Sequence, residues 1–218
     1  MKFKALICDL DGTLLDTVHS IAHFMNETLK AFGIEACRDE EYNYYAGNGA
    51  IELTRRTLRS KGISDDTLMG KVYTDYKKAY DNAPLYKTEI FTGISELIGA
   101  LKKKGVLLGV ISNKPHSAVV PIVKHFFGDV FDIVLGQSER FPLKPDGAVG
   151  VYAAETLGVL PSETVFIGDT GVDVEFARAF GAGLSVGVLW GFRDYKELSE
   201  AGADMIISKP DELLEVFR

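Results

Sequence analysis

The sequence predicts an α/β fold in which a parallel sheet is covered by helices on both faces. Short apolar runs recur along the chain, and patterns with a helical period separate them. From residue 18 to about residue 82 this alternation stops, and helical patterns follow one another with no convincing strand between them. The chain is therefore expected to form a sheet domain that a small all-helical insertion interrupts after the first strand.

Six apolar runs are the expected strands. They are FKALICDL (3–10), VLLGVIS (106–112), FDIVLG (131–136), TVFIGD (164–169), LSVGVL (184–189) and ADMIIS (203–208). One of the helices between them shows its apolar residues at spacing i, i+3, i+4 and i+7, namely Ile94, Leu97, Ile98 and Leu101, and Gly105 closes it. Runs that are apolar at every position indicate strands buried on both faces.

The helical insertion begins with one apolar stripe that Gly33 ends. The stripe consists of Ile21, Phe24, Met25, Leu29 and Phe32. Further helices are expected at 50–61 and 65–81, and the tyrosines at 73, 76 and 80 are expected on the packed side of the second of these. The predicted domains are 1–16 with 84–218, and 17–83, joined through hinges at LLDT and NAPLYKTEIF.

Composition limits the possible partners and compartment. The chain has 218 residues, of which 46% are hydrophobic and 25% charged, and its formal net charge is -7. This charge argues against a nucleic-acid or anionic-membrane surface, because both are bound through clustered Lys and Arg. Cys8 and Cys37 have neither metal-site nor disulfide spacing, so a cytoplasmic location is expected, and the N-terminal apolar run is too short for a membrane span. A monomer and a homodimer both remain open.

The first strand ends in two carboxylates. Asp9 and Asp11 are two residues apart, so their side chains share one face where the strand meets its loop. Gly12 permits a sharp turn there, and Thr13 adds a hydroxyl and a backbone N–H. An ordinary turn after a buried strand is the simpler interpretation of these residues alone.

Other strand ends bring further polar groups to the same edge of the sheet. Ser112 and Asn113 end the second strand of the sheet domain, Asp169 ends the fourth and Asp173 follows in the next helix. Lys144 lies in the loop FPLKPDG. Aspartates crowded into one crevice repel one another and require a cation, and oxygen ligands without nearby histidine or cysteine favour Mg²⁺ over zinc. Such a site suits a phosphate ester.

These residues resemble the haloacid dehalogenase superfamily, whose phosphatases carry DxDGT, then Ser or Thr, then Lys, then GDxxxD, in this order. The resemblance covers nearly the whole chain and implies a Rossmann-like core with a helical-bundle cap between the first two motifs. KPDG departs from the Pro-x-Pro run that often follows the lysine. The segment YAGNGAIELTRRTL, together with SNKP and LWGF, is similar to bacterial phosphoglycolate phosphatases, which makes phosphoglycolate the leading substrate.

The resemblance implies a role for each motif residue. Asp9 would be the nucleophile that forms an aspartyl phosphate, and Asp11 the general acid and then the general base. Mg²⁺ would be held by Asp9, the backbone carbonyl of Asp11 and Asp169, with Asp173 orienting this shell. The phosphoryl group would be bound through the residues Thr13, Ser112, Asn113 and Lys144.

Residues of the cap are candidates for contacting the substrate. The turn of Gly47, Asn48 and Gly49 would close over the site, and Arg56 would clamp a substrate carboxylate, although a solvated helix face explains Arg56 equally well. Three other functions remain open: a phosphomutase of the β-phosphoglucomutase type, a pyrophosphatase, and a non-catalytic interaction domain. Mutases use a cap histidine and a cap lysine to select their sugar, and neither has a convincing match in the sequence.

Overall fold

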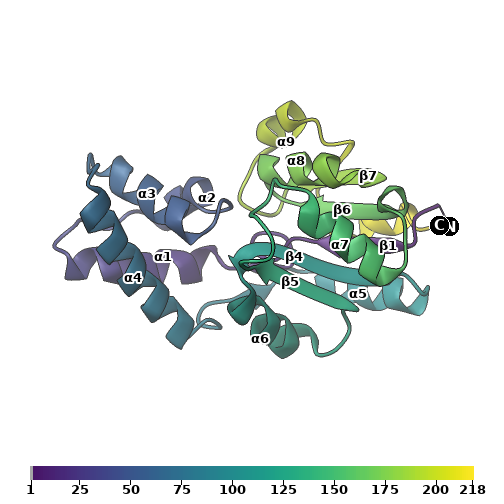
Figure 1. Ribbon diagram of the computed structural model, residues 1–218, viewed down its shortest axis with the longest axis horizontal. Coiled ribbons are helices and arrows are strands. Elements are labelled where there is room, and N and C mark those ends of the chain that lie inside the picture. The colour runs from purple at the N-terminus through teal and green to yellow at the C-terminus, as the bar shows by residue number, and fades with distance from the viewer. Residues whose placement is uncertain (1) are drawn as a thin grey trace.

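The computed structural model describes residues 2–218, and these form a six-stranded sheet in the order β5-β4-β1-β6-β7-β8 (Figure 1). The strands are β1 (Ala5–Cys8), β4 (Leu107–Pro115), β5 (Ile133–Gln137), β6 (Thr164–Gly168), β7 (Leu184–Val188) and β8 (Met205–Ile207). Every neighbouring pair in this sheet is parallel, which confirms the predicted fold class. Because β1 lies between β4 and β6, the ends of these three strands lie side by side.

Helices cover both faces of this sheet. They are α5 (Ile94–Lys103), α6 (His116–Phe127), α7 (Ala148–Leu157), α8 (Gly171–Phe180) and α9 (Tyr195–Ala201), with short 3-10 helices η2 (Pro161–Glu163) and η3 (Pro210–Glu215). Successive residues of β1 point to opposite faces: Leu6 packs in the core under α5 and α6, and Ile7 packs under α7 and α8. Within residues 2–218, every helix is too short or too polar to traverse a lipid bilayer.

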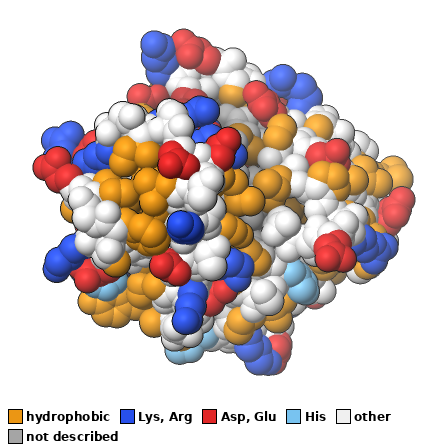
Figure 2. Space-filling view, turned by 60° about the vertical axis from the view of Figure 1, so that its left-hand side comes forward, with side chains coloured by type: hydrophobic (Ala, Val, Ile, Leu, Met, Phe, Trp, Pro, Cys, Tyr) orange, Lys and Arg blue, Asp and Glu red, His pale blue; other side chains and the backbone are white. Residues whose placement is uncertain are grey.

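The segment between β2 and β3 is helical. It contains α1 (Val18–Ala31), η1 (Asp39–Glu41), α2 (Tyr42–Tyr45), α3 (Ala50–Ser60) and α4 (Asp66–Asn82). These helices bury an apolar cluster of their own, which includes Met25, Leu29 and Val72. They lie beyond the end of the sheet where β1 leads out, opposite the chain termini (Figure 1). On the face toward this helical segment, Lys and Arg are interspersed with Asp and Glu (Figure 2).

A two-stranded antiparallel sheet joins the helical segment to the large sheet. Its strands are β2 (Leu15–Asp16) and β3 (Glu89–Ile90), and they lie in the two stretches expected to be hinges. The sequence did not indicate these strands, because two residues are too few to show a periodicity. They hold the two connections next to each other, and the exact domain limits at 17 and 83 stay a prediction.

Candidate active site

The chain turns sharply after β1 and packs against the end of β6. The N–H of Asp9 donates a hydrogen bond to the carbonyl of Ile167 (2.9 Å), which continues the sheet pairing by one residue. Gly12 has a φ of 84°, and a Cβ at this position would lie 2.2 Å from Oδ2 of Asp169. The turn therefore requires glycine, both for its backbone conformation and for its close contact with Asp169.

Thr13 binds Asp169 instead of facing open space. Its hydroxyl is fully buried and donates a hydrogen bond to Oδ1 of Asp169 (3.0 Å). Thr13 was expected from the sequence to take part in phosphate binding through its hydroxyl and backbone N–H. In the structure the hydroxyl binds a carboxylate, which places Thr13 to orient Asp169, and its contact with phosphate stays a prediction.

Lys144 is the cation at the centre of the site. Its side chain is only 2% exposed, and Nζ lies 2.7 Å from Oδ1 of Asp9 and 2.7 Å from Oδ1 of Asp173. Asn113 holds the loop that carries Lys144, because its Oδ1 accepts the N–H of Lys144 (2.8 Å) and its Nδ2 donates to the Lys144 carbonyl (3.3 Å). Asn113 thus acts on the position of Lys144, and its expected contact with substrate stays a prediction.

Two further carboxylates complete the group. Oδ2 of Asp169 accepts the N–H of Phe192 (2.7 Å), and Oδ2 of Asp173 accepts both the N–H and the hydroxyl of Thr170 (3.1 and 2.6 Å) at the start of α8. The carboxylates of Asp9, Asp169 and Asp173 each offer an oxygen within 4.8 Å of the other two. Residues that are far apart in the sequence therefore meet at one edge of the sheet, as the motif spacing predicts.

Negative charge exceeds positive charge in this group. Burial raises the pKa of Asp9 to about 7, although Lys144 lowers it, and burial beside Asp173 and Asp9 raises the pKa of Asp169 well above its usual range. Burial lowers the pKa of Lys144, but the two carboxylates raise it more, so the ammonium stays charged. One ammonium faces three buried carboxylates. This set of oxygen donors fits a divalent metal ion, which would supply the missing positive charge.

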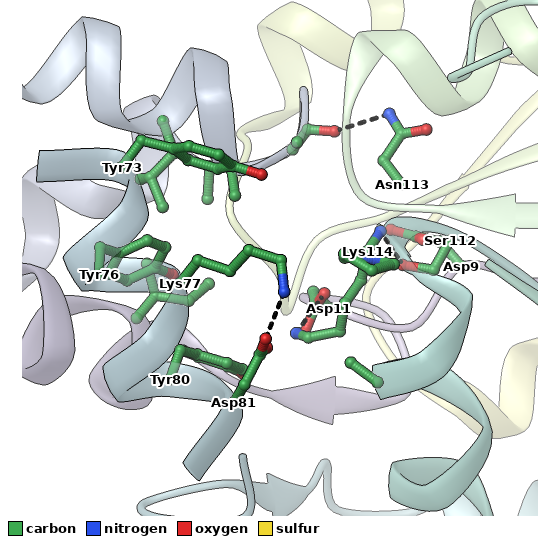
Figure 3. Close-up of a pocket in the computed structure, with 18 of the residues that line it drawn as sticks. Asp9, Asp11, Tyr73, Tyr76, Lys77, Tyr80, Asp81, Ser112, Asn113 and Lys114 are labelled. Carbon is green, nitrogen blue, oxygen red and sulfur yellow. Dashed lines mark hydrogen bonds and ion pairs between the residues drawn. The ribbon is translucent and has the colours of Figure 1, made fainter. Parts of the chain in front are cut away.

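A cavity lies between this group and α4 (Figure 3). It encloses an empty volume of about 750 Å³, part of it open to solvent. The sheet side contributes Asp9, Asp11, Ser112, Asn113 and Lys114, and the helical side contributes Gly47, Gly49, Tyr73, Tyr76, Lys77, Tyr80 and Asp81. The cavity is thus closed on one side by the carboxylates and on the other by the tyrosines of α4, with room for a small ester between them.

Lys114 is a residue of the cavity that the sequence analysis did not single out. Its Nζ contacts both carboxylate oxygens of Asp11, at 2.7 and 2.9 Å, and its N–H donates to Oγ of Ser112 (3.2 Å). Burial lowers the pKa of Lys114, but Asp11 and the hydroxyl of Tyr80 together raise it more, so this second ammonium is also charged. Its spacing of two from Ser112 was the available signal, because such residues share a face of a strand.

The tyrosines of α4 divide between packing and the cavity wall. Tyr76 and Tyr80 belong to the apolar cluster of the helical segment, as the packed-side interpretation predicts, and they also line the cavity. Tyr73 was expected on the same packed side, but it lines the cavity without belonging to the described cluster. The sequence pattern identified the packing of Tyr76 and Tyr80 but could not show that the packed face of α4 continues onto the cavity.

The loop before α3 touches the sheet domain. The carbonyl of Gly47 accepts a hydrogen bond from Nδ2 of Asn113 (3.2 Å), and Gly47 and Gly49 line the cavity. Asn48 is not among the described residues of the cavity wall. Arg193, which the sequence analysis missed, donates from a buried guanidinium to the carbonyl of Ala46 (2.8 Å). The loop is therefore held from two sides.

Arg56 lies outside the described cavity wall. Its Nε pairs with Glu52 at 3.2 Å, one turn earlier on α3, and its Nη1 donates to the carbonyl of Tyr44 (3.2 Å). The guanidinium is therefore engaged within the helical segment, and its expected contact with a substrate carboxylate stays a prediction.

Comparisons with known proteins agree with this site. The family model described as "Haloacid dehalogenase-like hydrolase" matches residues 6–186. The phosphoglycolate phosphatase of Thiobacillus denitrificans is 30% identical over 210 residues, which cover 95% of this chain and 92% of that protein. The phosphoglycolate phosphatase of Aquifex aeolicus is 28% identical over 216 residues, covering 98% and 96%.

Solved structures share the complete architecture. The crystal structure of a Lactobacillus delbrueckii protein that is named after phosphoglycolate phosphatase has a TM-score of 0.95 and 30% sequence identity to this chain. The match covers 99% of this chain and 98% of that one. A haloacid dehalogenase-like family protein from Streptococcus pneumoniae has a TM-score of 0.86 at 24% identity, covering 100% and 99%, which shows a common fold. With the four motifs assembled at one edge of the sheet, this chain belongs to the haloacid dehalogenase-like hydrolases and is a phosphatase similar to the phosphoglycolate phosphatases.

Proposed function

We propose that the protein hydrolyses a small phosphate monoester in a magnesium-dependent reaction, and that phosphoglycolate is its substrate. The observation that carries this proposal is that Asp9 and Asp11 line the cavity together, with the Lys144 ammonium 2.7 Å behind the Asp9 carboxylate. The names of the relatives support the choice of substrate, and the cavity, part of which is open to solvent, has room for a two-carbon ester.

The reaction proceeds in two displacements. A carboxylate oxygen of Asp9 attacks phosphorus and forms an aspartyl phosphate, while the bond from phosphorus to the ester oxygen breaks and Asp11 gives a proton to the leaving alkoxide. Asp11 then accepts a proton from a water molecule whose oxygen attacks phosphorus. This second step releases inorganic phosphate and restores the Asp9 carboxylate.

Lys144 and Ser112 are the groups of the sheet side that bind the phosphoryl oxygens. Lys144 already lies at the attacking carboxylate, so its ammonium stabilises charge on the group that Asp9 accepts. The Ser112 oxygen accepts the N–H of Lys114, which leaves the Ser112 hydroxyl proton available to an oxygen of the substrate.

The magnesium ion would be held by the side chains of Asp9 and Asp169 and by the backbone carbonyl of Asp11. Thr13 and the N–H of Phe192 fix the orientation of Asp169, and Asp173 acts through its ion pair with Lys144. When bound, the ion supplies positive charge that offsets the negative charge of the phosphoryl oxygens.

The test is the release of inorganic phosphate from phosphoglycolate with Mg²⁺ and with EDTA. We expect turnover only with Mg²⁺, and its loss in Asp9→Asn. Mass spectrometry of the acid-quenched protein should find the phosphoryl group on the peptide that contains Asp9. A folded wild-type protein that is inert toward a broad panel of esters, or a phosphoryl group on a different residue, would contradict the proposal.

A phosphomutase is the second candidate, and Lys77 is the observation that favours it. Lys77 is a lysine of the helical segment that lines the cavity, which is one half of the mutase pattern. The other half is a histidine, and the described cavity wall contains none. Product analysis with sugar phosphates separates the two reactions, because a mutase returns the phosphoryl group to the sugar.

The pyrophosphatase alternative is tested by comparing the rates of phosphate release from pyrophosphate and from phosphoglycolate at equal concentration.

The helical segment is proposed to act as a cap that opens and closes over the cavity. β2 and β3 carry both connections and lie side by side, so a rotation there moves α1–α4 together.

The proposed location is the cytoplasm, because Cys8 and Cys37 are free cysteines and their spacing does not suggest a disulfide framework.

A further inference from the structure

Two lysines pair with the two aspartates that follow β1. Lys144 lies beside Asp9, where the phosphoryl group would be transferred. Lys114 lies beside Asp11, where the leaving group would receive its proton. We call the part of the cavity wall formed by Asp11, Lys114 and Tyr80 the leaving-group end. Figure 3 shows Asp11 and Lys114 on the sheet side of this end, opposite Tyr80 on α4.

Lys114 retains a hydrogen-bond donor that its carboxylate partner does not use. An ammonium has three N–H groups, and the two oxygens of Asp11 account for two of them. The Lys114 side chain is 10% exposed and lines the cavity, so the remaining N–H has little access to bulk water. The group beside this N–H is Tyr80, which is neutral, so a carboxylate on a bound molecule would be a stronger acceptor for it.

Tyr80 provides a second donor beside it. The Lys114 ammonium lies 4.8 Å from the centre of the Tyr80 ring. Tyr80 is 5% exposed, and among residues 2–218 its hydroxyl finds no hydrogen-bond partner. Lys114 comes from the sheet and Tyr80 from α4, so an ammonium and a hydroxyl from the two parts of the chain lie together at the leaving-group end, and the Tyr80 hydroxyl proton is free for an acceptor.

Lys77 is less suited to the same task. Its ammonium is paired with Asp81, one turn later on α4, and its side chain is 40% exposed. The charge of Lys77 is therefore already balanced and partly hydrated, whereas Lys114 and Tyr80 are enclosed.

We propose that Lys114 and Tyr80 form an anion subsite that selects phosphate esters whose leaving group carries a carboxylate. The inference rests on the proposed function, since it places the ester oxygen at Asp11. Lys114 contacts that same Asp11, so the carboxylate must lie within a few bonds of the ester oxygen. A short 2-phosphooxy acid meets this requirement: its two carboxylate oxygens accept from the Lys114 ammonium and the Tyr80 hydroxyl.

The test compares two esters of similar size in the wild-type protein and in Lys114→Met. One is phosphoglycolate, and the other is 2-hydroxyethyl phosphate, which carries a neutral hydroxyl in place of the carboxylate. Because Lys114 also contacts Asp11, the variant is expected to lose activity on both esters. The preference for phosphoglycolate, taken as the ratio of the two kcat/KM values, should fall by about 10- to 100-fold, the range for losing a hydrogen bond to a charged group.

Tyr80→Phe removes only the hydroxyl and should reduce the same preference by about 3- to 10-fold. Two controls make the same chemical changes outside the cavity. Lys124→Met removes an exposed lysine paired with Asp129, and Tyr45→Phe removes a hydroxyl that binds Glu41. Both controls should keep the wild-type preference.

Isothermal titration calorimetry of the two esters with the Asp9→Asn variant measures their affinities without turnover and so tests the subsite independently of catalysis. We expect phosphoglycolate to bind more tightly than 2-hydroxyethyl phosphate, and Lys114→Met added to Asp9→Asn to remove this difference. An unchanged preference in Lys114→Met, or a preference lost in Lys77→Met alone, would overturn the inference. A different outcome is also informative: the wild-type protein does not hydrolyse phosphoglycolate, but Asp9→Asn still binds it in a way that requires Lys114. That result would refute the proposed function and leave the subsite standing.

Discussion

The removal of the Lys144 ammonium should destabilise the protein strongly. In Lys144→Met the apolar stem is kept, but Asp9 and Asp173 lose the one charge that lies 2.7 Å from each of them. Breaking a buried ion pair by removing one partner costs about 3 to 5 kcal/mol, because the remaining charge stays buried. Most domains of this kind are stable by about 5 to 15 kcal/mol, so the variant should still fold at room temperature.

The assay is urea unfolding followed by far-UV circular dichroism in EDTA, with Lys124→Met as the matched control. Lys124 pairs with Asp129 on the surface, where the two side chains are 60% and 83% exposed, so its loss should cost less than about 1 kcal/mol. Added Mg²⁺ should narrow the gap between Lys144→Met and the wild type, because it would replace part of the lost charge.

A second substitution tests the physical reason. Asp173→Asn, introduced into Lys144→Met, removes one of the two uncompensated carboxylates and should recover part of the lost stability. If Lys144→Met lost no more stability than Lys124→Met, the account of Lys144 as the balancing charge would be wrong.

Two further predictions concern catalysis and pH. Asp11→Asn should slow the formation of the aspartyl phosphate from phosphoglycolate by about 10²- to 10⁴-fold, and from 4-nitrophenyl phosphate by much less, because a nitrophenolate leaves without a proton. Rapid-quench measurement isolates this first step from the later hydrolysis, in which Asp11 acts as the base for both esters; equal losses in the first step would argue against Asp11 as the general acid. In EDTA the pKa of Asp9, about 7 against an ordinary 3.8, lies above that of the unfolded chain. The folded protein therefore binds more protons, and its free energy of unfolding should fall by up to about 4 kcal/mol as the pH rises from about 4 to 7. Urea midpoints measured across this window should fall in EDTA and fall less in Mg²⁺, and a flat profile in EDTA would contradict the effect of burial on Asp9.

The sequence was sufficient for the fold class and for the groups around Asp9. The runs that became β1, β4 and β6 are apolar throughout, and a strand apolar on both faces has few alternatives to the interior of a parallel sheet. Strand ends of such a sheet share an edge, so the positions of Asp9, Ser112 and Asp169 at the ends of their apolar runs were enough to predict that they meet. The family match over residues 6–186 agrees with this expectation.

Contacts between the helical segment and the sheet were beyond the reach of the sequence. Periodicity assigned Tyr80 to a packed face of its helix, and this is where it lies, but the same face continues onto the cavity beside Lys114. Periodicity describes one element at a time, whereas the distance between Tyr80 and Lys114 depends on how two elements are oriented.

The sequence by itself determined which polar groups gather at the edge of the sheet, because the strand ends that hold Asp9, Asp11, Ser112 and Asp169 follow from local patterns of burial and turning. Only the tertiary structure decided which partner each polar side chain takes. In the structure the Thr13 hydroxyl hydrogen-bonds Asp169, Arg56 pairs with Glu52, and Lys114 pairs with Asp11. The reason is physical: a buried charge takes whichever partner the packing of the whole chain brings within about 3 Å, and that packing is a property of all the elements together.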